Sequence, residues 1–578
     1  MQNQQRVEFN GQEILCTKKT EVRMARVVSV GTQNFEKIIS NNCFYIDKTF
    51  FIKEWWENED EVTLITRPRR FGKTLNMNML ERFWSVEYKG QGEIFQNLSI
   101  WQEEKYRELQ GTYPVIFLSF AGVKETSYDM AVYRICFFLQ ELYIKYYNLL
   151  DSNLLTDGEK RMFRKMTDGI NVEDAPIALY QLSKYLYRYY GKKVIILLDE
   201  YDTPMHEAYT GGYWKEMVSF TRTLFNNTFK SNSYLERAVM TGITKISKES
   251  LFSDLNNLKV ITMTSKKYAS CFGFTEAEVF AAMDEFGMTN KEEVKRWYDG
   301  FTIGDLKDIY NPWSIINLLD EGNLKTYWAN TSSNELAGSL LRLGDVNLKM
   351  QFEELLSGAT ISCKIDEEIV FHQLGQKRNA VWSLLLASGY LKVVGIRDDI
   401  YEMQLTNYEV RKMFENMVSD WFGEDTVNYN GFLKALLRGD LEEMNEYMNR
   451  FSLAMFSSFD GGTHPSKEAA PERFYHGFVL GLLVDLAGRY KVTSNRESGL
   501  GRYDVMLKPL NKEDDGIILE FKIYNPKKEV DLEETVQAAL KQIEEKRYEQ
   551  ELLDSGIKKN HIRKYGFAFE GKKILIGK

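Results

Sequence analysis

Short runs of apolar and β-branched residues alternate with longer segments of helical period through the first half of the chain. The runs cover residues 62–66 (VTLIT), 115–120 (VIFLSF), 194–198 (VIILL) and 237–241 (RAVMT). Strands buried on both faces read as continuous apolar runs, and their alternation with helices is typical of a parallel sheet. The pattern therefore predicts an α/β domain whose helices cover both faces of the sheet.

The pattern changes twice further along the chain. Helical spacing dominates from about residue 334, interrupted by two alternating runs around Arg397-Asp398-Asp399. This order predicts a helical, winged-helix-like module over 334–458, although a helical lid with a separate hairpin would explain the same pattern. After a stretch that contains Gly, Pro and Ser, a helix, a hairpin and another helix follow. They predict a C-terminal α/β domain over 459–578.

Length and composition agree with several soluble domains. The 578 residues exceed what one hydrophobic core usually supports. No segment approaches the ~20 apolar residues of a membrane helix, and the N-terminus MQNQQRVEFNGQ lacks the pattern of a signal peptide. We therefore expect a cytoplasmic protein with no membrane contact. The five cysteines include no CxxC pair, which argues against disulfides and a cysteine zinc site.

The charge is unevenly distributed. Residues 466–578 contain 21 Lys and Arg against 19 Asp and Glu, a net charge of +2, whereas the rest contains 53 against 64, a net charge of −11. A total of −9 argues against a protein that coats nucleic acid through overall attraction. The C-terminal part has a mild bias toward a polyanionic partner.

A phosphate-binding motif follows the first apolar run directly. Gly72, Lys73 and Thr74 end the segment TRPRRFGKT and open a helical pattern. Glycine lets backbone N–H groups approach phosphate, lysine reaches the β and γ phosphates, and the threonine hydroxyl can hold Mg²⁺. Arg67 stands where the first glycine of this motif is expected. These residues predict an ATP site.

A second acidic motif supports the nucleotide site. The strand-like run KKVIILL ends in Asp199 and Glu200. An acid at this strand end can hold the magnesium hydration shell, and the next acid can polarise the attacking water. The run RAVMTGIT follows as a candidate sensor strand, so that Thr241 or Thr244 would face the γ phosphate. Asp202 and His206 are better explained as local structure.

Three arginines lie inside or beside the loop: Arg67, Arg69 and Arg70. Their guanidinium groups can neutralise the charge of transferring phosphate, which predicts nucleotide contacts for Arg67 and Arg70. Ion pairs with carboxylates of the following region explain the same residues equally well. Arginines beside a nucleotide site could also complete the site of a neighbouring subunit, so a homo-oligomer is a further possibility.

Near the C-terminus two acids and a lysine are predicted to share one sheet face. Glu520 and Lys522 are two residues apart in a strand, so they project from the same face, and Asp504 on the partner strand can lie opposite them. Such a cluster is electrostatically costly without a purpose, which a divalent metal would supply.

Several motifs together resemble the AAA-ATPase-like family of bacterial and archaeal proteins, in which a PD-(D/E)XK domain commonly follows. They are FYIDKTFFIKEWW, RPRRFGKT, LLDEYDTP, TGITKISKESLFSDLNNL, FGFTEAEV, WYDGF and YNPWSI. The resemblance implies an ASCE-type P-loop domain over 31–333 that binds ATP and Mg²⁺, leaving 1–30 as an N-terminal extension. It also places Tyr45, Asp47 and Lys48 near the nucleotide, although a structural hydrogen-bonded turn explains this motif better.

The C-terminal cluster resembles the PD-(D/E)XK nuclease pattern. This resemblance implies that Asp504 and Glu520 hold Mg²⁺, or Mn²⁺, and that Lys522 orients the attacking water. Glu472, Gln542 and Tyr548 match further positions of the family pattern. The remaining candidates are left open: His476 as a metal ligand or a buried histidine, and Arg496 and Arg502 as phosphodiester contacts or a solvated loop.

The two motifs together predict an ATPase coupled to a metal-dependent endonuclease with a restriction-endonuclease-like fold. Its expected partner is nucleic acid, with DNA favoured over RNA, in defence or in the processing of mobile elements. Two alternatives remain: an ATP-dependent switch or scaffold whose nuclease-like domain binds without cutting, and an ATPase that acts mechanically, with the C-terminal part as a tether.

Overall fold

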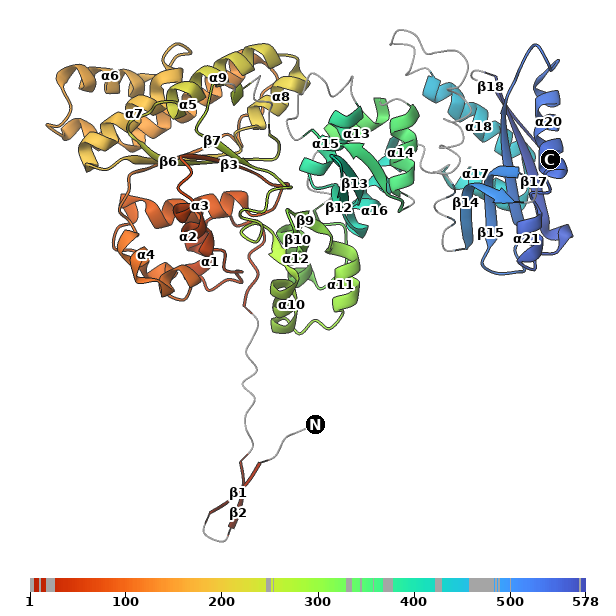
Figure 1. Ribbon diagram of the computed structural model, residues 1–578, viewed down its shortest axis with the longest axis horizontal. Helices are drawn as coiled ribbons and strands as arrows, with labels where there is room; N and C mark the ends of the chain where they lie inside the picture. Colours follow the sequence, from red (N-terminus) through yellow and green to blue (C-terminus); the bar gives the residue numbers. More distant parts are fainter. Residues whose placement is uncertain are drawn as a thin grey trace.

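The chain folds into several α/β units, which follow one another from the N-terminus to the C-terminus (Figure 1). The computed structural model describes residues 5–9, 12–16, 26–245, 251–252, 254–328, 335–343, 346–356, 358–366, 378–421, 429–456, 483, 486, 489–498, 501–570 and 573–578. A short antiparallel hairpin, β1 (Gln5–Phe9) with β2 (Gln12–Cys16), precedes the first unit.

The first unit is built on a five-stranded parallel sheet. Its strands are β3 (Val62–Thr66), β4 (Val115–Ser119), β5 (Val194–Asp199), β6 (Leu235–Gly242) and β7 (Leu258–Ile261). The spatial order is β4-β5-β6-β3-β7, and every pairing is parallel. The predicted α/β class is therefore confirmed, with β6 inserted between the strand that precedes the phosphate loop and the strand that carries Asp199.

Helices cover both faces of this sheet (Figure 1). One side carries α1 (Phe35–Ser40), α2 (Phe50–Glu57), α3 (Lys73–Trp84) and α4 (Glu104–Leu109); the other carries α5 (Tyr128–Lys145), α6 (Asp157–Asp168), α7 (Ala175–Tyr190), α8 (Thr203–Gly211) and α9 (Trp214–Phe229). All residues of β3 and β5 are buried, as the apolar runs predict for strands covered on both faces.

A small helical and antiparallel unit follows the parallel sheet. It contains β8 (Phe274–Thr275), α10 (Glu276–Glu285), α11 (Lys291–Tyr298), β9 (Phe301–Ile303), β10 (Leu306–Tyr310) and α12 (Pro312–Glu321). The strands pair in the order β8-β10-β9. Asn311 caps α12, because its side chain accepts a hydrogen bond from the backbone N–H of Trp313 and Pro312 opens the helix.

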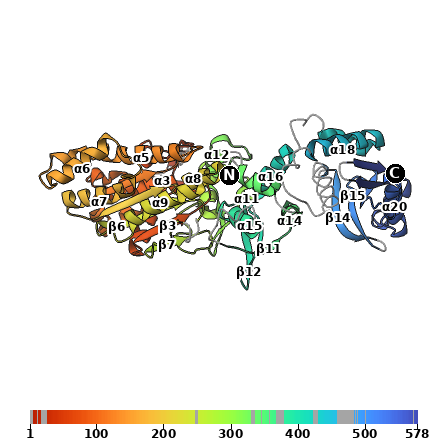
Figure 2. The same cartoon turned by 90° about the horizontal axis from the view of Figure 1, so that it is seen from above.

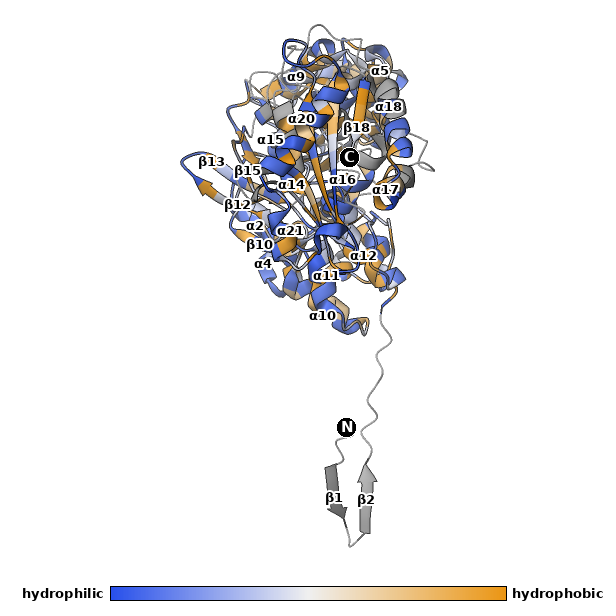
Figure 3. Cartoon of the chain, turned by 90° about the vertical axis from the view of Figure 1, so that its right-hand side faces the viewer, coloured by the Kyte–Doolittle hydropathy of each residue, from blue (hydrophilic) through white to orange (hydrophobic). Residues whose placement is uncertain are grey.

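The middle region, here the winged-helix-like region, combines helices with a small antiparallel sheet. Its elements are α13 (Glu335–Leu343), α14 (Val346–Leu356), β11 (Ile361–Lys364), α15 (Arg378–Ala387), β12 (Leu391–Arg397), β13 (Ile400–Leu405) and α16 (Tyr408–Trp421). The three strands pair antiparallel in the order β11-β13-β12. The β12–β13 hairpin projects from the neighbouring helices (Figures 2 and 3). The buried apolar residues of this region continue those of the parallel sheet in one cluster.

The C-terminal unit is a mixed five-stranded sheet. Its strands are β14 (Tyr490–Ser498), β15 (Gly501–Pro509), β16 (Gly516–Ile523), β17 (Ile562–Glu570) and β18 (Lys573–Gly577), paired in this order, and only β16 and β17 run parallel. Helices α20 (Leu532–Glu545) and α21 (Gln550–Asp554) connect β16 to β17. The sequence predicted only the β15–β16 hairpin of this sheet.

Two helices that precede residue 459 pack against the C-terminal sheet. Helices α17 (Tyr429–Arg438) and α18 (Leu441–Phe456) share one buried core with the C-terminal sheet, which includes Phe432, Met448 and Phe521. Helical periodicity alone cannot show which neighbouring sheet a helix packs against. The core of the C-terminal sheet therefore includes residues of α17 and α18.

Two asparagines of α18 cover the free edge of the sheet. The amide group of Asn445 donates to the carbonyl of Ile576 at 2.9 Å and accepts from its N–H at 2.7 Å. Asn449, one turn later, makes the same two bonds to Ile574, at 2.7 and 3.0 Å. The side-chain amides thus take the place of a sixth strand, which protects the edge of β18 against pairing with another chain.

Among the residues that the structure describes, no helix is both long enough and apolar enough to span a membrane.

We expect Asn445→Ala and Asn449→Ala each to lower the free energy of unfolding by about 1–3 kcal/mol, because each leaves a backbone N–H and C=O of β18 without their partners. Urea unfolding, with hydrogen exchange at Ile574 and Ile576, would measure the loss. Glu446→Ala changes an exposed residue of the same helix and serves as the control. Equal stability of all three variants would contradict this role.

Candidate functional site

The phosphate loop joins the end of β3 to the start of α3. Two of its residues have left-handed backbone angles, with φ of 64° at Arg70 and 82° at Gly72. Gly72 tolerates this conformation at no steric cost, and successive N–H groups in such turns form a concave site for anions. The local backbone is therefore suited to a phosphate group at the N-terminus of α3.

Lys73 lies inside this turn. Its ammonium donates to the carbonyls of Arg67 and Pro68, at 3.0 and 2.8 Å. Burial lowers the pKa of Lys73, and the carboxylates of Glu200, Asp202 and Asp199 oppose that shift. The lysine is therefore a desolvated cation beside a group of acids.

Asp199 brings three predicted residues together at the carboxyl edge of the sheet. Its carboxylate accepts hydrogen bonds from the hydroxyl of Thr74, at 2.8 Å, and from that of Thr241, at 2.5 Å. Burial raises the pKa of Asp199, although both hydrogen bonds counteract the shift. Glu200 follows in a left-handed conformation with φ of 51°, and its backbone N–H donates to Thr241. Thr74, Asp199, Glu200 and Thr241 thus lie in one cluster.

The structure does not bring Arg67 to the surface of the loop. Its side chain is fully buried, and its guanidinium donates to the carbonyls of Thr66 and Thr262, at 2.9 and 2.8 Å. Burial lowers its pKa to about 10, so it remains a cation at neutral pH. In this position the arginine ties β3 to the loop after β7. Arg70 instead lies over the ring of Trp313, 4.2 Å from its centre.

Asp202 and Thr244 form a structural pair beside the cluster. The Asp202 carboxylate accepts from the backbone N–H groups of Ile243 and Thr244, at 2.9 and 2.8 Å, and from the Thr244 hydroxyl. His206 lies 3.3 Å from the same carboxylate. Although burial alone raises it, these hydrogen bonds bring the pKa of Asp202 below its usual value. Asp202 and His206 therefore take part in the local structure beside the cluster.

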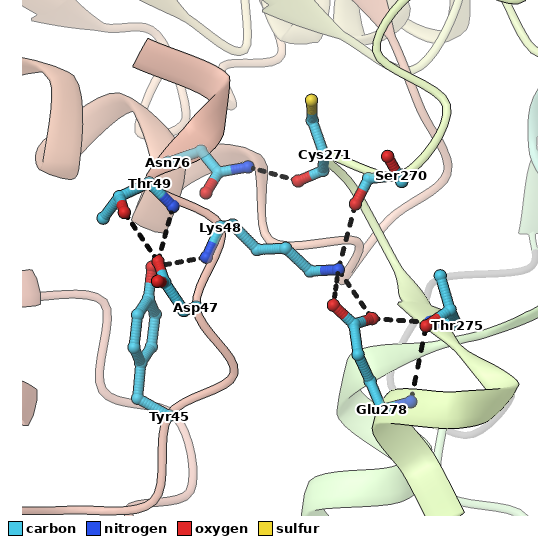
Figure 4. Close-up of polar contacts among 9 residues, drawn as sticks. All are labelled: Tyr45, Asp47, Lys48, Thr49, Asn76, Ser270, Cys271, Thr275 and Glu278. Carbon is cyan, nitrogen blue, oxygen red and sulfur yellow. Dashed lines mark hydrogen bonds and ion pairs between the residues drawn. The ribbon is translucent and has the colours of Figure 1, made fainter. Parts of the chain in front are cut away.

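The motif around Lys48 is also structural. Asp47 accepts from the N–H and the hydroxyl of Thr49, which closes a turn before α2. Lys48 is buried and forms an ion pair of 2.7 Å with Glu278, which belongs to the capping box of α10 (Figure 4). Its ammonium also donates to the carbonyl of Ser270. This confirms the hydrogen-bonded turn and shows that it ties the N-terminal helices to α10.

In the C-terminal unit, Asp504 and Glu520 lie on the neighbouring strands β15 and β16. The antiparallel register pairs Val505 with Leu519, and the backbone N–H of Phe521 donates to the Asp504 carboxylate at 2.8 Å. Phe521 points into the core on the opposite face, where it contacts Phe567. The predicted alternation of side chains along β16 is therefore present.

Gln542 of α20 connects the site residues of this face. Its Oε1 accepts from the ammonium of Lys522 at 2.7 Å, while its amide nitrogen donates to the carboxylate of Glu520. The same nitrogen lies 3.2 Å from the hydroxyl of Tyr548, whose pKa is raised by burial and by the nearby carboxylates of Glu520 and Asp504. One amide thus sets the spacing between the acid and the lysine.

Glu472 and His476 lie outside the described residues, as do the side chains of Arg496 and Arg502. Within the described part of the chain, no three His, Cys, Asp or Glu side chains are grouped as metal ligands.

The parallel sheet with its phosphate loop and edge acids defines a P-loop NTPase fold, and the mixed C-terminal sheet with its acids and lysine has a nuclease-like arrangement. Comparison with known families agrees. Residues 29–252 match the family described as predicted AAA-ATPase, and residues 470–578 match the PD-(D/E)XK nuclease superfamily. These matches confirm the predicted order of domains and support ATPase and nuclease-like activity in general.

One curated relative is the "uncharacterized protein in vnfD 5'region" of Azotobacter chroococcum mcd 1. It is 29% identical over 316 residues, which cover 54% of this chain and 55% of the relative. The chain therefore spans about half the length of this relative.

Sequence reasoning missed the residues that hold the phosphate loop from outside, Asn311 and Trp328. Because Asn311 precedes a proline, the sequence indicates a helix cap at this position. Nothing in the local sequence indicates its second contact, the hydrogen bond from its side chain to the carbonyl of Arg69. Trp328 contacts the loop across 259 positions of sequence, and no local pattern reports such a contact.

We expect Asp199→Asn to stabilise the nucleotide-free protein by on the order of 1 kcal/mol at pH 7. Burial raises the pKa of Asp199, so its ionisation costs stability as the pH rises from the unfolded value of about 4 through the raised folded value. Asparagine removes that cost. Thermal unfolding across pH would measure the gain.

Asp202→Asn is the matched control of opposite sign. Because hydrogen bonds lower the pKa of Asp202, its ionised form stabilises the fold above the unfolded pKa, and this contribution is lost as the pH falls. We expect the variant to lose about 1.5–3 kcal/mol at pH 7. Shifts of the same sign in both variants would refute this assignment of the two aspartates.

Proposed function

We propose that this chain is a nucleotide-regulated, metal-dependent nuclease, in which ATP binds at the phosphate loop and nucleic acid is cut at the C-terminal site. The observation that carries the proposal is the convergence of Glu520 and Lys522 on Gln542, beside Asp504 on the next strand. Family matches in the same order along the chain support it.

The nucleotide would sit at the start of α3. The N–H groups of the loop and the N-terminus of the helix attract the phosphates, and Lys73 would exchange its bonds to loop carbonyls for the β and γ phosphate oxygens. Thr74 and Asp199 are the residues suited to hold Mg²⁺, a hard cation that prefers oxygen ligands. Glu200, next to them, would orient the attacking water. The prediction that Arg67 contacts phosphate receives no support from its buried contacts, whereas Arg70 remains a candidate.

The donor set of the C-terminal site fits a divalent cation. Mg²⁺ commonly binds one or two carboxylates and completes its shell with water and substrate phosphate, so that two acids suffice. Asp504 and Glu520 supply these oxygens from adjacent strands. When bound, the ion would polarise the scissile phosphate and lower the pKa of a water ligand.

The protein side chains then have separate tasks. Lys522 would orient the water and stabilise the negative charge that develops on the phosphate. Gln542 would hold Lys522 and Glu520 at a fixed spacing, since it bonds to both. Glu472 stays a candidate for an additional acid at this site. DNA is the favoured substrate, in defence or in the processing of mobile elements, and ATP turnover would control access to the site.

We expect Lys73→Ala to weaken ATP binding by about 10- to 100-fold, the range for hydrogen bonds to charged groups. Titration calorimetry with Mg²⁺ and ATP would measure the affinity. Lys230→Ala removes an exposed lysine at the end of α9 and should bind like the parent. Full binding by the Lys73 variant would remove the phosphate-loop assignment.

We expect the full-length protein to nick supercoiled plasmid DNA with Mg²⁺ or Mn²⁺ and ATP, and Glu520→Gln to lower the rate by at least about 100-fold. Glu544→Gln is the control, because Glu544 lies on the adjacent helix α20 but pairs with Lys564 instead. If neither the parent nor the control cuts DNA or RNA, the scaffold alternative replaces the nuclease. If the Glu520 variant cuts as fast as the parent, the site assignment fails.

A further inference from the structure

The phosphate loop is held from outside by side chains far away in sequence. The carbonyl of Arg69 accepts two hydrogen bonds, one from the side-chain amide of Asn311 at 3.3 Å and one from the indole N–H of Trp328 at 3.1 Å. Neither donor belongs to the sheet that carries the loop. This single carbonyl therefore connects the loop to the units that follow it.

These two bonds fix the orientation of a peptide group in the loop. The carbonyl of Arg69 and the N–H of Arg70 belong to one planar peptide, in which they point in opposite directions. A carbonyl held outward leaves the N–H of Arg70 pointing to the inner side of the turn. Since Arg70 and Gly72 both have left-handed backbone angles, this N–H belongs to the concave group of donors that suits an anion.

Trp328 is itself held by the winged-helix-like region. It is almost fully buried, and its ring packs against Phe301 and Tyr390, with ring centres 5.6 and 5.5 Å away. Its backbone N–H donates to the carboxylate of Glu409 at 2.7 Å, in the first turn of α16. Glu409 also accepts from the hydroxyl of Ser314 in α12. A continuous chain of contacts thus runs from α16 to the phosphate loop.

A second contact joins the same two regions. Gly389, just after α15, has a φ of 85° and lies so close to Pro68 that an added Cβ would meet its ring at 2.7 Å. Helix α15 is the element that a winged-helix protein would offer to nucleic acid, yet its residues 380–386 are all buried. Helix α15 packs against α13, β11 and β12 of its own region, and the turn that follows it at Gly389 meets the phosphate loop.

We propose that Trp328 and Asn311 are positioning residues of the nucleotide site, and that through Trp328 the winged-helix-like region senses whether nucleotide is bound. The inference rests on the proposed ATP site and assigns its regulation. Phosphate that engages the N–H of Arg70 strengthens the opposite carbonyl as an acceptor. The bonds to Trp328 tighten in turn, and Tyr390 and α16 become more ordered.

The test compares two buried tryptophans that differ in their acceptor. Trp328→Phe keeps an aromatic ring against Tyr390 but removes the N–H that binds the loop. Trp382→Phe removes an equally buried indole N–H, which donates to Gln351 at 3.1 Å and does not reach the loop. Asn311→Asp is a second variant, since aspartate keeps the cap of α12 while losing the amide donor.

The measurements are the affinity of the full-length protein for Mg²⁺ and ATP and the hydrogen exchange of residues 385–414 with and without nucleotide. In the parent, ATP should slow exchange in this segment. We expect Trp328→Phe and Asn311→Asp to bind ATP on the order of fivefold more weakly, and the Trp328 variant to lose the slowing. Trp382→Phe should retain both.

The outcomes separate this inference from the proposed function. If the parent binds ATP, Lys73→Ala binds it more weakly as expected, and both loop variants behave like Trp382→Phe, then the positioning role is overturned while the nucleotide site stands. Equal losses in Trp328→Phe and Trp382→Phe would also overturn it, because they would reflect a general loss of packing. If the parent shows no saturable binding of ATP, the nucleotide site fails and the inference fails with it.

Discussion

The parallel pairing of β3 with β6, and of β6 with β5, determines where the chemistry of the first unit lies. Because parallel strands end at the same edge of the sheet, the loop after β3, Thr241 near the end of β6 and Asp199 at the end of β5 meet although 125 positions separate Thr74 from Asp199. The sheet can bring a desolvated lysine and a buried carboxylate together because its interior is already covered on both faces.

Much of the fold and of both candidate sites could be predicted from sequence, since the informative signals were local. Gly72-Lys73-Thr74, the acid at the end of an apolar run, and the two-residue spacing of Glu520 and Lys522 each encode geometry within a few residues. Arg67 looked like a phosphate ligand for the same local reason. Its burial depends on the carbonyls of a loop almost two hundred positions away, which no motif can reveal. The packing of α17 and α18 against the C-terminal sheet was not predicted for a similar reason, because helical periodicity does not show which elements a helix contacts.

The two candidate sites differ in which groups stabilise their buried acidic side chains. Asp199 is held at the edge of a rigid sheet by two hydroxyls, and the unit accepts the electrostatic cost of a buried acid. Around Glu520 the balance comes from a neutral amide, because Gln542 offers a donor to the acid and an acceptor to the lysine. The first arrangement relies on a scaffold of parallel strands, the second on one helix that packs over a mixed sheet. The relation between them would pass through the winged-helix-like region, whose core is continuous with that of the first unit.

The side-chain amides of α18 have a consequence for dissecting this protein. The family match to the nuclease superfamily starts at residue 470, beyond both Asn445 and Asn449. A fragment cut at that position would retain the acids and the lysine but would uncover the outer edge of β18, and uncovered edges pair readily with strands of other molecules. A fragment that starts before α17 retains Asn445 and Asn449, which cover the edge of β18. The smallest fragment whose sheet keeps this edge covered is therefore larger than the part that matches the nuclease superfamily.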